Sequence, residues 1–559
     1  MDSSTAEAST AEMYIGVDVG TCSVRAGLFT RNGELVSMSS QPLRVNQPKA
    51  DFSEQSSDEI WEGVCSVVKA VAAHTRDNTQ IKGIGFDATC SLVVLDEDFL
   101  PVSVSPTGDA EWNVVMWMDH RAKDQAERIN AGRHDVLRNV GGKMSLEMQP
   151  PKLMWLKECL HEQCWKKAKH FMDLPDFLTF KATGSTSRSL CSLVCKWGFQ
   201  ASEEGERFWD DSFWQEIGLH DLVTDNHDSI GSVALVRGRR VRGGRVRRRA
   251  GRASPPRGDA RWLRRSSMRT RRGLGAVGCR RGRGATAVRA ARCRSVPVIC
   301  GTSACHMAIS ERPLFVPGVW GPFYAAMVPN YWLSEAGQSA AGKLLDHIIE
   351  THPAYAEVMS LKQSDDHAQV FLNRHLQGLS EARGLASMAR LTAQLHVWPD
   401  FHGNRSPIAD PNIRGMICGL TLDKSVDDLA ILYLASMQAL AYSTRSIIEA
   451  LVKHGHDIQM VILCAGLSKN SLYCQVHADA LEMSVVVPEA SECVLLGAAL
   501  LASCAAAAFA SPREAMQSMT GSSTLVKPTL QDRRFHEKKY KVFTQMVKHQ
   551  DEYKVTMAG

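Results

Sequence analysis

Two stretches within the first hundred residues alternate apolar runs with clusters of small residues. Residues 13–36 ("MYIGVDVGTCSVRAGLFTRNGELV") are apolar, glycine-rich, apolar again, and then turn at Asn32-Gly33, which predicts a strand, a tight loop, a second strand and a hairpin. Residues 82–96 ("KGIGFDATCSLVVLD") predict two further strands around a small-residue loop. Between these stretches, residues 56–74 carry apolar positions at helical spacing after an acidic start and predict a helix.

The second half of the chain repeats this alternation. Residues 298–310 ("VICGTSACHMAIS") predict a strand, a Gly-Thr loop and another strand. A long helical pattern over residues 425–454 is followed by the apolar strand "MVILCAG" and by an apolar, alanine-rich helix over residues 495–510. Strands alternate with helices in both halves, which indicates an α/β protein of two domains.

Residues 237–294 interrupt this pattern. They contain 22 arginines, no lysine, no glutamate and a single aspartate, Asp259. The whole chain has 65 basic and 60 acidic residues and a net charge of +5, and without these 22 arginines and one aspartate it would have 43 and 59, a net charge of −16. The basic character therefore comes from one segment, and the acidic remainder argues against a nucleic acid or an anionic membrane as partner.

The cysteines and the apolar runs predict a cytoplasmic protein. The 16 cysteines form no C-x-x-C pair and no zinc-site spacing, which favours a reducing compartment. Residues 1–12 form a polar tail without the basic and apolar regions of a signal peptide. The apolar run at 495–510 is short for a membrane span and is more typical of a buried helix.

The first Gly-Thr loop has the chemistry of a phosphate site. In "GVDVGTCSVR", Asp18 ends a predicted strand, and Gly20 lets the backbone approach a phosphate. The hydroxyls of Thr21 and Ser23 can bind the phosphate oxygens, and Asp18 can hold Mg²⁺ through water. Taken alone, such a run is equally compatible with an ordinary β-turn.

Two loops in the second half extend this site. The loop "CGTSACH" repeats the pattern, and two such loops facing one cleft would grip a triphosphate from both sides. The loop "CAGLSKN" follows a strand and would let a base or ribose approach, although an ordinary β–α turn fits it as well. The candidate residues of the two loops are Gly301, Thr302, Ser303, Gly466 and Asn470.

A sugar pocket needs several polar groups and an aromatic wall. Polar and aromatic residues gather in four short motifs, although each residue singly could equally be a surface or capping residue. The candidates are Asp87, Thr89, Cys90, Trp117, Asp119, Arg121, Lys196, Glu335 and Gln338.

Taken in order, these motifs resemble those of the FGGY carbohydrate kinases. The motifs that carry the resemblance are "GVDVGTCSVR", "FDATCS", "WMDHRA", "PPKLMWL", "CGTS", "EAGQSAAGKLLDHI", "WPDFHGNRSP" and "CAGLSKN". The resemblance implies two ribonuclease H-like ATPase domains of the actin and hexokinase type with a cleft between them. It implies a polar tail at 1–12, an N-terminal domain at 13–236, an anomalous arginine-rich segment at 237–297 and a C-terminal domain at 298–559.

The resemblance also implies an activity and roles for residues. It implies ATP- and Mg²⁺-dependent phosphorylation of a primary hydroxyl of a small ketose by a cytosolic monomer or homodimer. "FDATCS" and "EAGQS" favour the ribulokinase-like branch and a ketopentose such as D-ribulose. By position, Asp18, Thr21 and Thr302 resemble the Mg²⁺ and phosphate groups, Gly466 and Asn470 the adenosine loop, and Asp87, Thr89, Lys196 and Glu335 the sugar contacts. Ala465 departs from the family, which usually has the first of two glycines there, and its methyl group would crowd the nucleotide.

The family's catalytic base is missing from this chain. The resemblance places it as the aspartate of an Asp-Ala-His-Ala-Gly-Gly run near Met268, and no such run is present. GC-rich DNA that encodes Ser-Leu-Ile-Asp-Ala-His-Ala reads Arg-Ser-Ser-Met-Arg-Thr-Arg when shifted by one base, and this is the sequence of residues 265–271. Our hypothesis is that residues 237–294 are an out-of-frame reading, and Asp259 has the wrong position and neighbours to replace the base.

Two other classes of function stay open at this stage. A chain without the base could be a non-catalytic sugar- or nucleotide-binding protein that kept the fold. An RNA-binding protein could instead use the Arg/Gly run as an arm. That run has one tryptophan, Trp262, and no phenylalanine or tyrosine, so it lacks the aromatic residues that favour base stacking, and we expect no nucleic-acid partner.

Overall fold

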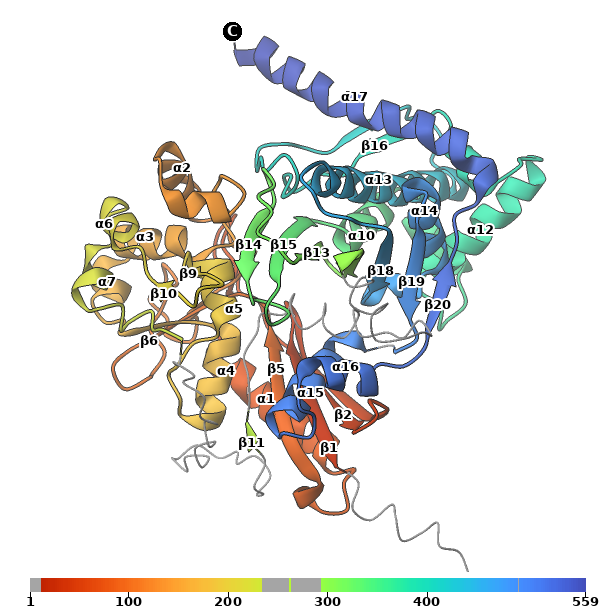
Figure 1. The fold of residues 1–559 in the computed structure, drawn as a ribbon. Coiled ribbons are helices and arrows are strands. Elements are labelled where there is room, and N and C mark those ends of the chain that lie inside the picture. Colours follow the sequence, from red (N-terminus) through yellow and green to blue (C-terminus); the bar gives the residue numbers. More distant parts are fainter. Residues whose placement is uncertain (1–11, 234–260, 263–292, 491, 559) are drawn as a thin grey trace, which may run out of the picture.

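The structure is a computed structural model that describes residues 12–233, 261–262, 293–490 and 492–558 (Figure 1). Two sheets with helices packed on them form its two main parts, which confirms the α/β prediction. Most of the arginine-rich segment 237–297, and with it the expected base position near Met268, lies outside the described residues.

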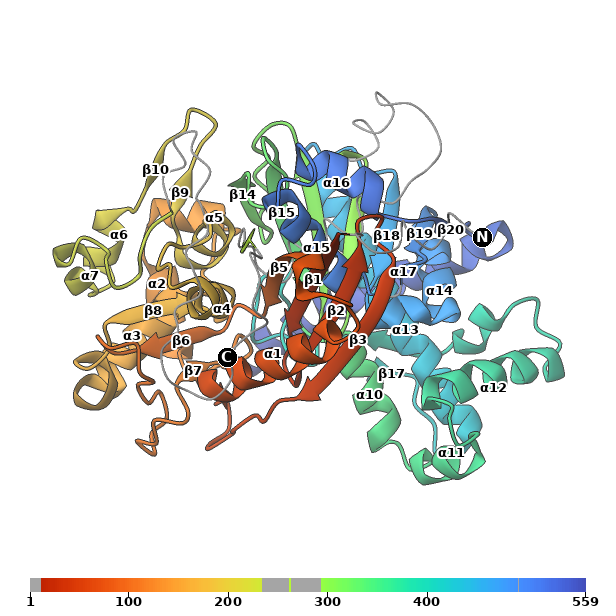
Figure 2. The same ribbon diagram turned by 90° about the horizontal axis from the view of Figure 1, so that it is seen from below.

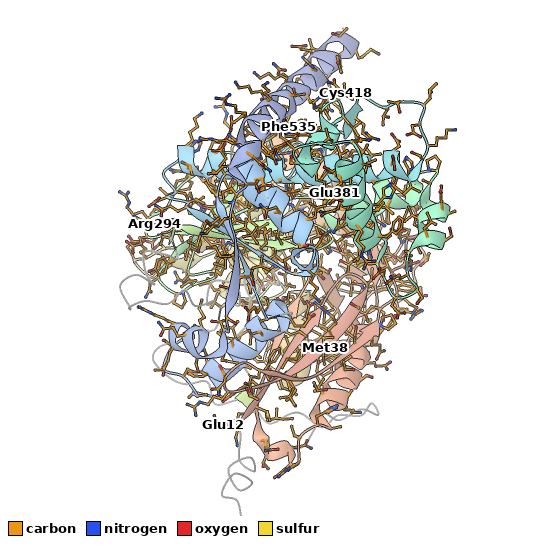
Figure 3. All side chains as sticks on the ribbon, turned by 90° about the vertical axis from the view of Figure 1, so that its right-hand side faces the viewer. Glu12, Met38, Arg294, Glu381, Cys418 and Phe535 are labelled. Carbon is orange, nitrogen blue, oxygen red and sulfur yellow. The ribbon has the colours of Figure 1, made fainter. Side chains whose placement is uncertain are left out.

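The first sheet has the strand order β11-β5-β1-β2-β3. Strands β1, β2 and β3 are antiparallel neighbours, and β5 and β11 run parallel to β1, which confirms the strand, loop and hairpin predicted at 13–36. β3 is the exposed edge, where Met38 faces solvent (Figure 3). The strands are β1 (Met13–Val19), β2 (Ser23–Thr30), β3 (Leu35–Pro42), β5 (Ile81–Ala88) and β11 (Arg261–Trp262).

Helices cover both faces of this sheet, as Figure 2 shows. Helix α1 (Ser57–Ala72) begins where the side chain of Ser56 accepts a hydrogen bond from the backbone N–H of Glu59, and its apolar side packs against alternate residues of β1 and β2. Helix α15 (Cys493–Ala505) packs on the opposite face. Because both faces are covered, β1 is a nearly continuous apolar run rather than an alternating one.

The approach of α15 to the sheet is very close. A Cβ atom on Gly16 would lie 1.9 Å from the carbonyl oxygen of Leu495, and one on Gly85 would lie 2.1 Å from that of Ala498. Only glycines permit this distance between helix and strands. The buried helix predicted at 495–510 is confirmed as far as Ala505, where α15 ends, and among the described residues no helix is both long and apolar enough to span a membrane.

The second sheet repeats the arrangement of the first, in the order β14-β15-β13-β12-β18-β19-β20. β12, β13 and β15 are antiparallel neighbours, while β18 runs parallel to β12 and β19 parallel to β18. The strands are β12 (Ser295–Cys300), β13 (Ala304–Ser310), β14 (Trp320–Tyr324), β15 (Trp332–Gln338), β18 (Met460–Cys464), β19 (Ser484–Pro488) and β20 (Ser523–Val526). The main helices on this sheet are α10 (Gly342–Thr351), α13 (Val426–Lys453) and α14 (Ser471–Leu481).

The remaining elements decorate these two cores. A small sheet in the first half has the order β4-β7-β6-β8. Its strands and the neighbouring elements are β4 (Glu54–Gln55), β6 (Leu92–Leu95), β7 (Val114–Val115), β8 (His170–Asp173), β9 (Gln200–Ala201), β10 (Arg207–Phe208), α2 (Lys123–Ala131), α3 (Gln149–Cys159), α4 (Leu174–Thr183), α5 (Leu190–Ser192), α6 (Asp211–Glu216) and α7 (His220–Thr224). Those of the second half are α11 (Tyr355–Leu361), α12 (Ala368–Ala382), β16 (His396–Trp398), β17 (Met416–Cys418), α16 (Pro512–Met519) and α17 (Arg533–Ala558). Short 3₁₀ or π turns lie at Asn78–Gln80, Asp135–Asn139, His161–Trp165, Leu193–Trp197, Met388–Thr392, Gly466–Lys469 and Leu530–Asp532.

The chain crosses between the two parts more than once. The division predicted at residues 236 and 298 stays a prediction, and α15, which falls in its C-terminal part, completes the core of the first sheet. The core around the first sheet is therefore built from both ends of the chain.

Candidate active site

Three charged residues lie in one row across the first sheet. Asp18 at the end of β1 is the register partner of Asp87 on β5 and of Arg25 on β2. The carboxyl groups of Asp18 and Asp87 are 1% and 0% exposed. Nη2 of Arg25 lies 2.5 Å from Oδ2 of Asp18, and its Nη1 lies 2.8 Å from Oε2 of Glu492, which precedes α15. The guanidinium offsets part of the negative charge that Asp18, Asp87 and Glu492 bring to this edge.

The first Gly-Thr loop turns tightly beside this row. The backbone N–H of Gly20 donates to the carbonyl oxygen of Ser23 over 2.8 Å. Nε1 of Trp117 donates to the hydroxyl of Thr21 over 3.2 Å, and the side chain of Gln55 donates to its carbonyl over 3.0 Å. The half-buried Thr21 is thus held from two sides at the end of the strand that carries Asp18.

The second Gly-Thr loop is anchored to the start of α10. The N–H of Gly301 donates to Ser303 over 2.9 Å, and the N–H groups of Ala341 and Lys343 donate to the carbonyl of Thr302 over 2.9 and 3.2 Å. Thr302 itself is exposed. The two loops occupy equivalent places, since each joins the first two antiparallel strands of its sheet.

The third candidate loop, between β18 and α14, has an open side. A Cβ on Gly466 would meet no atom within 4 Å. The side chain of Asn470 is engaged inside the protein, where it caps α14 by accepting from the backbone N–H of Tyr473 and donates to the hydroxyl of Tyr433. Of the two candidates, Gly466 therefore borders free space and Asn470 holds the loop.

Several sugar candidates meet where the two halves of the chain face each other. Nζ of Lys196 lies 4.2 Å from the ring centre of Trp320, and Trp320 is the register partner of Glu335. The backbone N–H of Thr89 donates to the carbonyl of Val19, which places it beside the row of charges. Lys196, Glu335 and Asp87 are all buried, and a common sugar site formed by them stays a prediction.

Asp119 and Arg121 form a separate, closed network. Nε and Nη2 of Arg121 contact the carboxylate of Asp119 over 2.8–2.9 Å, Nη2 also reaches Glu54 over 2.9 Å, and Nη1 donates to a backbone carbonyl over 2.7 Å. The guanidinium lies between the rings of Phe52 and Trp155. Every nitrogen of this guanidinium is engaged within the protein, so the contacts favour a structural role, and a sugar contact by either residue stays a prediction.

Gln338 also faces away from the other candidates. Its side-chain nitrogen donates to the carbonyl of Leu440 on α13 over 2.8 Å. Glu335 and Gln338 are three positions apart on β15, and an odd separation along a strand puts side chains on opposite faces.

Sequence reasoning missed four residues of this region. Glu147, Trp320 and Arg405 meet at the boundary between the two halves. The fourth residue is the buried Asp173, and the side chain of Gln149 donates both to its carboxylate and to the backbone carbonyl of Cys90. Burial, and secondarily Asp176, raise the pKa of the Asp173 carboxyl to about 7, while its Oδ1 accepts from Gln149. The "WPDFHGNRSP" motif was a usable signal for Arg405, but nothing in the sequence pairs it with Glu147.

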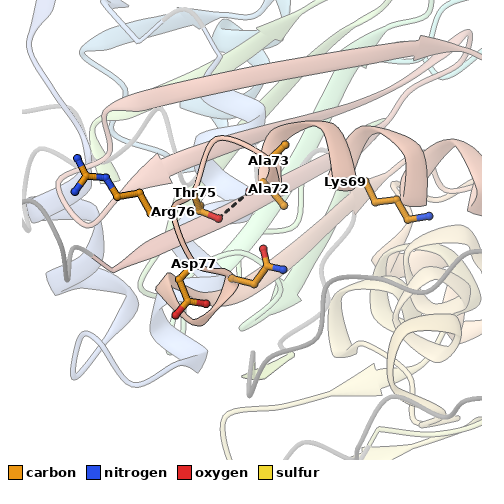
Figure 4. Close-up of a pocket in the computed structure, with 7 residues that line it drawn as sticks. Lys69, Ala72, Ala73, Thr75, Arg76 and Asp77 are labelled. Carbon is orange, nitrogen blue, oxygen red and sulfur yellow. Dashed lines mark hydrogen bonds between the residues drawn. The ribbon is translucent and has the colours of Figure 1, made fainter.

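A surface pocket elsewhere holds none of the candidates. It is lined by residues at the C-terminal end of α1 and in the turn after it, where the hydroxyl of Thr75 donates to the carbonyl of Ala72 (Figure 4). The loop at Thr21 contacts Gln55 at the other end of α1, and a helix of 16 residues is about 24 Å long. The pocket is therefore remote from the charged row.

A metal at the charged row would have few protein ligands. Within the described residues, no group of three or more histidines, cysteines, aspartates and glutamates is arranged to hold a metal ion. Mg²⁺ usually takes one or two carboxylates and fills its other positions with water and phosphate oxygens. The buried pair of Asp18 and Asp87 fits that requirement.

Comparison with known proteins assigns both halves of the chain to related family models. Residues 13–219 match the N-terminal domain of the FGGY family of carbohydrate kinases, and residues 296–506 match its C-terminal domain, so neither model covers residues 220–295. The FGGY carbohydrate kinase domain-containing protein of Homo sapiens is 50% identical over 97% of this chain and 98% of its own length. A D-ribulokinase of Saccharomyces cerevisiae is 37% identical over 90% of this chain and 73% of its own length.

Solved structures show the same fold at low sequence identity. A xylulose kinase from Rhodospirillum rubrum superposes with a TM-score of 0.73 at 18% identity, covering 97% of this chain and 99% of the other. A glycerol kinase from Plasmodium falciparum with ADP superposes with a TM-score of 0.70 at 14% identity, covering 96% and 98%.

Proposed function

We propose a substrate and a mechanism for this chain on the premise that it belongs to the FGGY family of carbohydrate kinases, whose members are sugar phosphotransferases. The proposed reaction transfers the γ-phosphate of ATP to a primary hydroxyl of a small ketose. A ketopentose such as D-ribulose is the proposed acceptor, because a relative 37% identical to this chain is a D-ribulokinase.

The observation that carries this proposal is the pairing of Asp18 with Asp87 beside the first Gly-Thr loop, with a second Gly-Thr loop at the equivalent position of the other sheet. Asp18 would hold Mg²⁺ through water, and Thr21 and Thr302 would bind phosphate oxygens from the two sides. When bound with ATP, Mg²⁺ neutralises the charge that develops on the phosphates. The open side of Gly466 would receive the adenosine.

The acceptor sugar is proposed to lie among Asp87, Thr89, Lys196 and Glu335, with Trp320 as the aromatic wall. Attack by the sugar oxygen forms its bond to the γ-phosphorus as the bond to the bridging oxygen of ADP breaks. A carboxylate must accept the hydroxyl proton, and burial of the site excludes water as a competing acceptor.

The proton acceptor is the part that this sequence lacks. Asp173 is a poor substitute, since it is fully buried and its carboxylate already accepts from Gln149 and Trp197. We therefore propose that the chain as written binds nucleotide and sugar with little turnover, and that the in-frame reading of residues 237–294 supplies the base. If the arginine-rich reading is the one in the cell, the protein is a binding protein that kept the fold.

We also propose a cytoplasmic location and a monomeric or homodimeric state. No disulfide joins the cysteines in the described part of the chain, and many of them are buried free thiols. Thiols in this state are typical of a reducing compartment.

The test compares two forms of the protein after the transcript has been sequenced across codons 230–300. One form is the chain as written, and the other restores the frame so that residues 265–271 read Ser-Leu-Ile-Asp-Ala-His-Ala. We expect ADP release with D-ribulose from the restored form at about 10²–10⁴ times the rate of the written form, the usual contribution of a positioned base. Replacing the restored aspartate by asparagine is the matched control and should return the low rate.

Each alternative has its own outcome. Equal rates in the two forms would show that the base lies elsewhere. Absence of turnover in both forms with D-ribulose and with other small polyols would overturn the kinase proposal for this chain.

A further inference from the structure

Arg405 is presented at the boundary between the two halves by a braced loop. The loop follows β16, and within it the carboxylate of Asp400 accepts from Nδ2 of Asn404 over 2.7 Å. Oδ1 of Asn404 accepts from the backbone N–H of Ile408 over 2.9 Å, and the hydroxyl of Ser406 donates to the carbonyl of Gly318 over 2.8 Å. Bonds on both sides of Arg405 thus hold its backbone in place.

The C-terminal helix steadies the same loop from outside. Nζ of Lys554 on α17 lies 3.0 Å from the carboxylate of Asp410. The side chain of Gln550 both accepts from the backbone N–H of Arg414 and donates to its carbonyl, over 2.9 and 2.8 Å. The loop is therefore a fixed support for Arg405.

The guanidinium of Arg405 reaches across to the first half of the chain. Its Nη2 lies 2.5 Å from Oε1 of Glu147, and the two side chains are 3% and 9% exposed. Its Nη1 lies 3.5 Å from Sγ of Cys305, in a space that exists because Gly337 has no side chain, since a Cβ there would be 2.7 Å from Nη1. A buried ion pair of this kind strongly disfavours separation of its partners, because each charge would lose its counterion.

Two tryptophans flank this ion pair. The centre of the guanidinium is 6.0 Å from the ring of Trp117 and 5.7 Å from the ring of Trp320. Trp117 donates to the hydroxyl of Thr21 in the first Gly-Thr loop, and Trp320 lies against Lys196. Arg405 thus lies between the proposed phosphate side and the proposed sugar side of the site.

A second contact between the halves lies beside it. The rings of His120 and His402 stack with centres 4.6 Å apart and planes 21° apart. Burial is the main cause that lowers the pKa of both imidazoles, and the nearby Glu147 carboxylate opposes it in both. The ion pair and the stacked rings therefore join the two halves at the same place, in addition to contacts such as that of the N–H of Gly318 with the carbonyl of Gly141.

We propose that Arg405 is a positioning residue that latches the two halves closed over the sugar pocket through Glu147 and fixes the rings of Trp117 and Trp320. The latch rests on the proposed function for its connection to sugar binding. It differs from a general structural ion pair in one respect. Weakening it should loosen the sugar pocket more than it weakens nucleotide binding, because the loop of Gly466 is held by Asn470 and only Trp117 connects Arg405 to the phosphate side.

The test uses the full chain with Glu147→Gln, Arg405→Gln, the double variant and the conservative Arg405→Lys. Glu158→Gln is the matched control, because it removes the same charge from an exposed pair with Arg128. Hydrogen exchange is measured in the free protein over residues 115–121 and 318–324. Calorimetry then gives the Kd of a non-hydrolysable ATP analogue with Mg²⁺, and that of D-ribulose in its presence.

We expect each Gln variant to raise exchange in both segments and to weaken D-ribulose binding at least ten-fold, with a clearly smaller effect on the Kd of the analogue. The double variant should show no greater exchange and no weaker D-ribulose binding than either single Gln variant. Arg405→Lys should give values nearer those of the wild type, and Glu158→Gln should leave both measurements unchanged. If the Gln variants exchanged hydrogen and bound D-ribulose as the wild type does, the latch proposal would be overturned. Equal loss of nucleotide and sugar binding, with exchange raised throughout, would reduce it to a structural ion pair.

The two proposals fail in different ways. If the unsubstituted protein bound the ATP analogue and no ketose, the proposed substrate would be wrong, and a sugar-pocket role for Arg405 with it. The exchange measurement, which needs no ligand, would still decide whether Glu147 and Arg405 hold the halves together.

Discussion

Asp18 and Asp87 are register partners on the neighbouring parallel strands β1 and β5, and both carboxyl groups are buried at the same edge of the sheet. Two adjacent carboxylates in a buried place repel each other unless a cation is shared between them. Arg25 supplies one positive charge by its contact with Asp18. Under the proposed function, Asp18 would hold Mg²⁺ at this edge.

Replacing Asp18 by asparagine should weaken the Mg²⁺-dependent part of ATP binding. We expect the affinity for ATP with Mg²⁺ to fall about ten-fold or more, since one charged ligand contact is commonly worth about 1.5–3 kcal/mol. Binding without Mg²⁺ should change much less, as calorimetry in the presence and absence of the metal would show. Asp98→Asn, on an exposed turn, is the control, and an equal loss with and without Mg²⁺ would argue against a metal-holding role.

Ala465→Gly should stabilise the protein. Ala465 adopts φ 77° and ψ −163°, a region of backbone space that is essentially restricted to glycine. Relief of this strain should raise the free energy of unfolding by about 1–2 kcal/mol, as measured by urea denaturation. Gly466→Ala, at the neighbouring position with open space and no positive φ, should leave stability nearly unchanged. A destabilised Ala465→Gly variant would contradict the strained geometry.

Gly85→Ala should destabilise the contact between α15 and the first sheet. The added methyl group would lie 2.1 Å from the carbonyl oxygen of Ala498, so the helix must move away from the strands. We expect a loss of about 3 kcal/mol and a lower Tm. Gly378→Ala is the opposite control, because that glycine lies in α12 with no atom near its Cβ, and the change should stabilise by about 0.5–1 kcal/mol. Similar effects of both substitutions would rule out the close approach.

His477 should make the protein sensitive to acid. Burial lowers the pKa of its imidazole to about 4, while its Nδ1 contacts the carbonyl oxygen of Tyr473. In the unfolded chain the same imidazole has a pKa near 6.5, so it binds a proton at a higher pH than in the folded protein. The stability of the folded protein is therefore complete above about pH 6.5, and part of it is lost as the pH falls toward 4. His477→Gln should reduce the loss of unfolding free energy between pH 6.5 and 4.5 by about 2 kcal/mol.

The comparison with the variant is needed because other groups titrate in the same interval. Burial raises the pKa of Asp173 and of Asp400 to about 7. Because the folded protein binds these protons more readily than the unfolded chain, their titration increases the free energy of unfolding as the pH falls. Denaturation curves of both proteins at matched pH values isolate the histidine. Parallel curves would show that His477 is not buried in its neutral form.

The loops were predictable from the sequence because their chemistry is local. Gly20, Thr21 and Asp18 lie within four residues, and the strands on either side are marked by apolar runs. The pairing of Asp18 with Asp87 was not predictable, because it depends on which strands become neighbours and in which register. For the same reason the sequence indicated a buried helix at 495–510 but not the sheet against which it packs.

The sugar candidates show a different limit. Arg121 in "WMDHRA" looks like a ligand because it is a cation beside an aspartate and an aromatic residue. The structure brings Glu54, from a strand about 70 residues earlier, to the same guanidinium and completes a closed network. Arg405 is the opposite case, because it was not among the candidates although it lies beside them. Its partner Glu147 is too distant in sequence for the pairing to be predicted.

The packing of α15 on the first sheet sets an order of events during protein synthesis. β1, β2 and β5 leave the ribosome early, but the helix that covers one of their faces lies roughly 400 residues later. At typical elongation rates of about 5–20 residues per second, that face waits on the order of 20 to 80 seconds for its cover. The nascent first half therefore exposes an apolar surface to aggregation for that time.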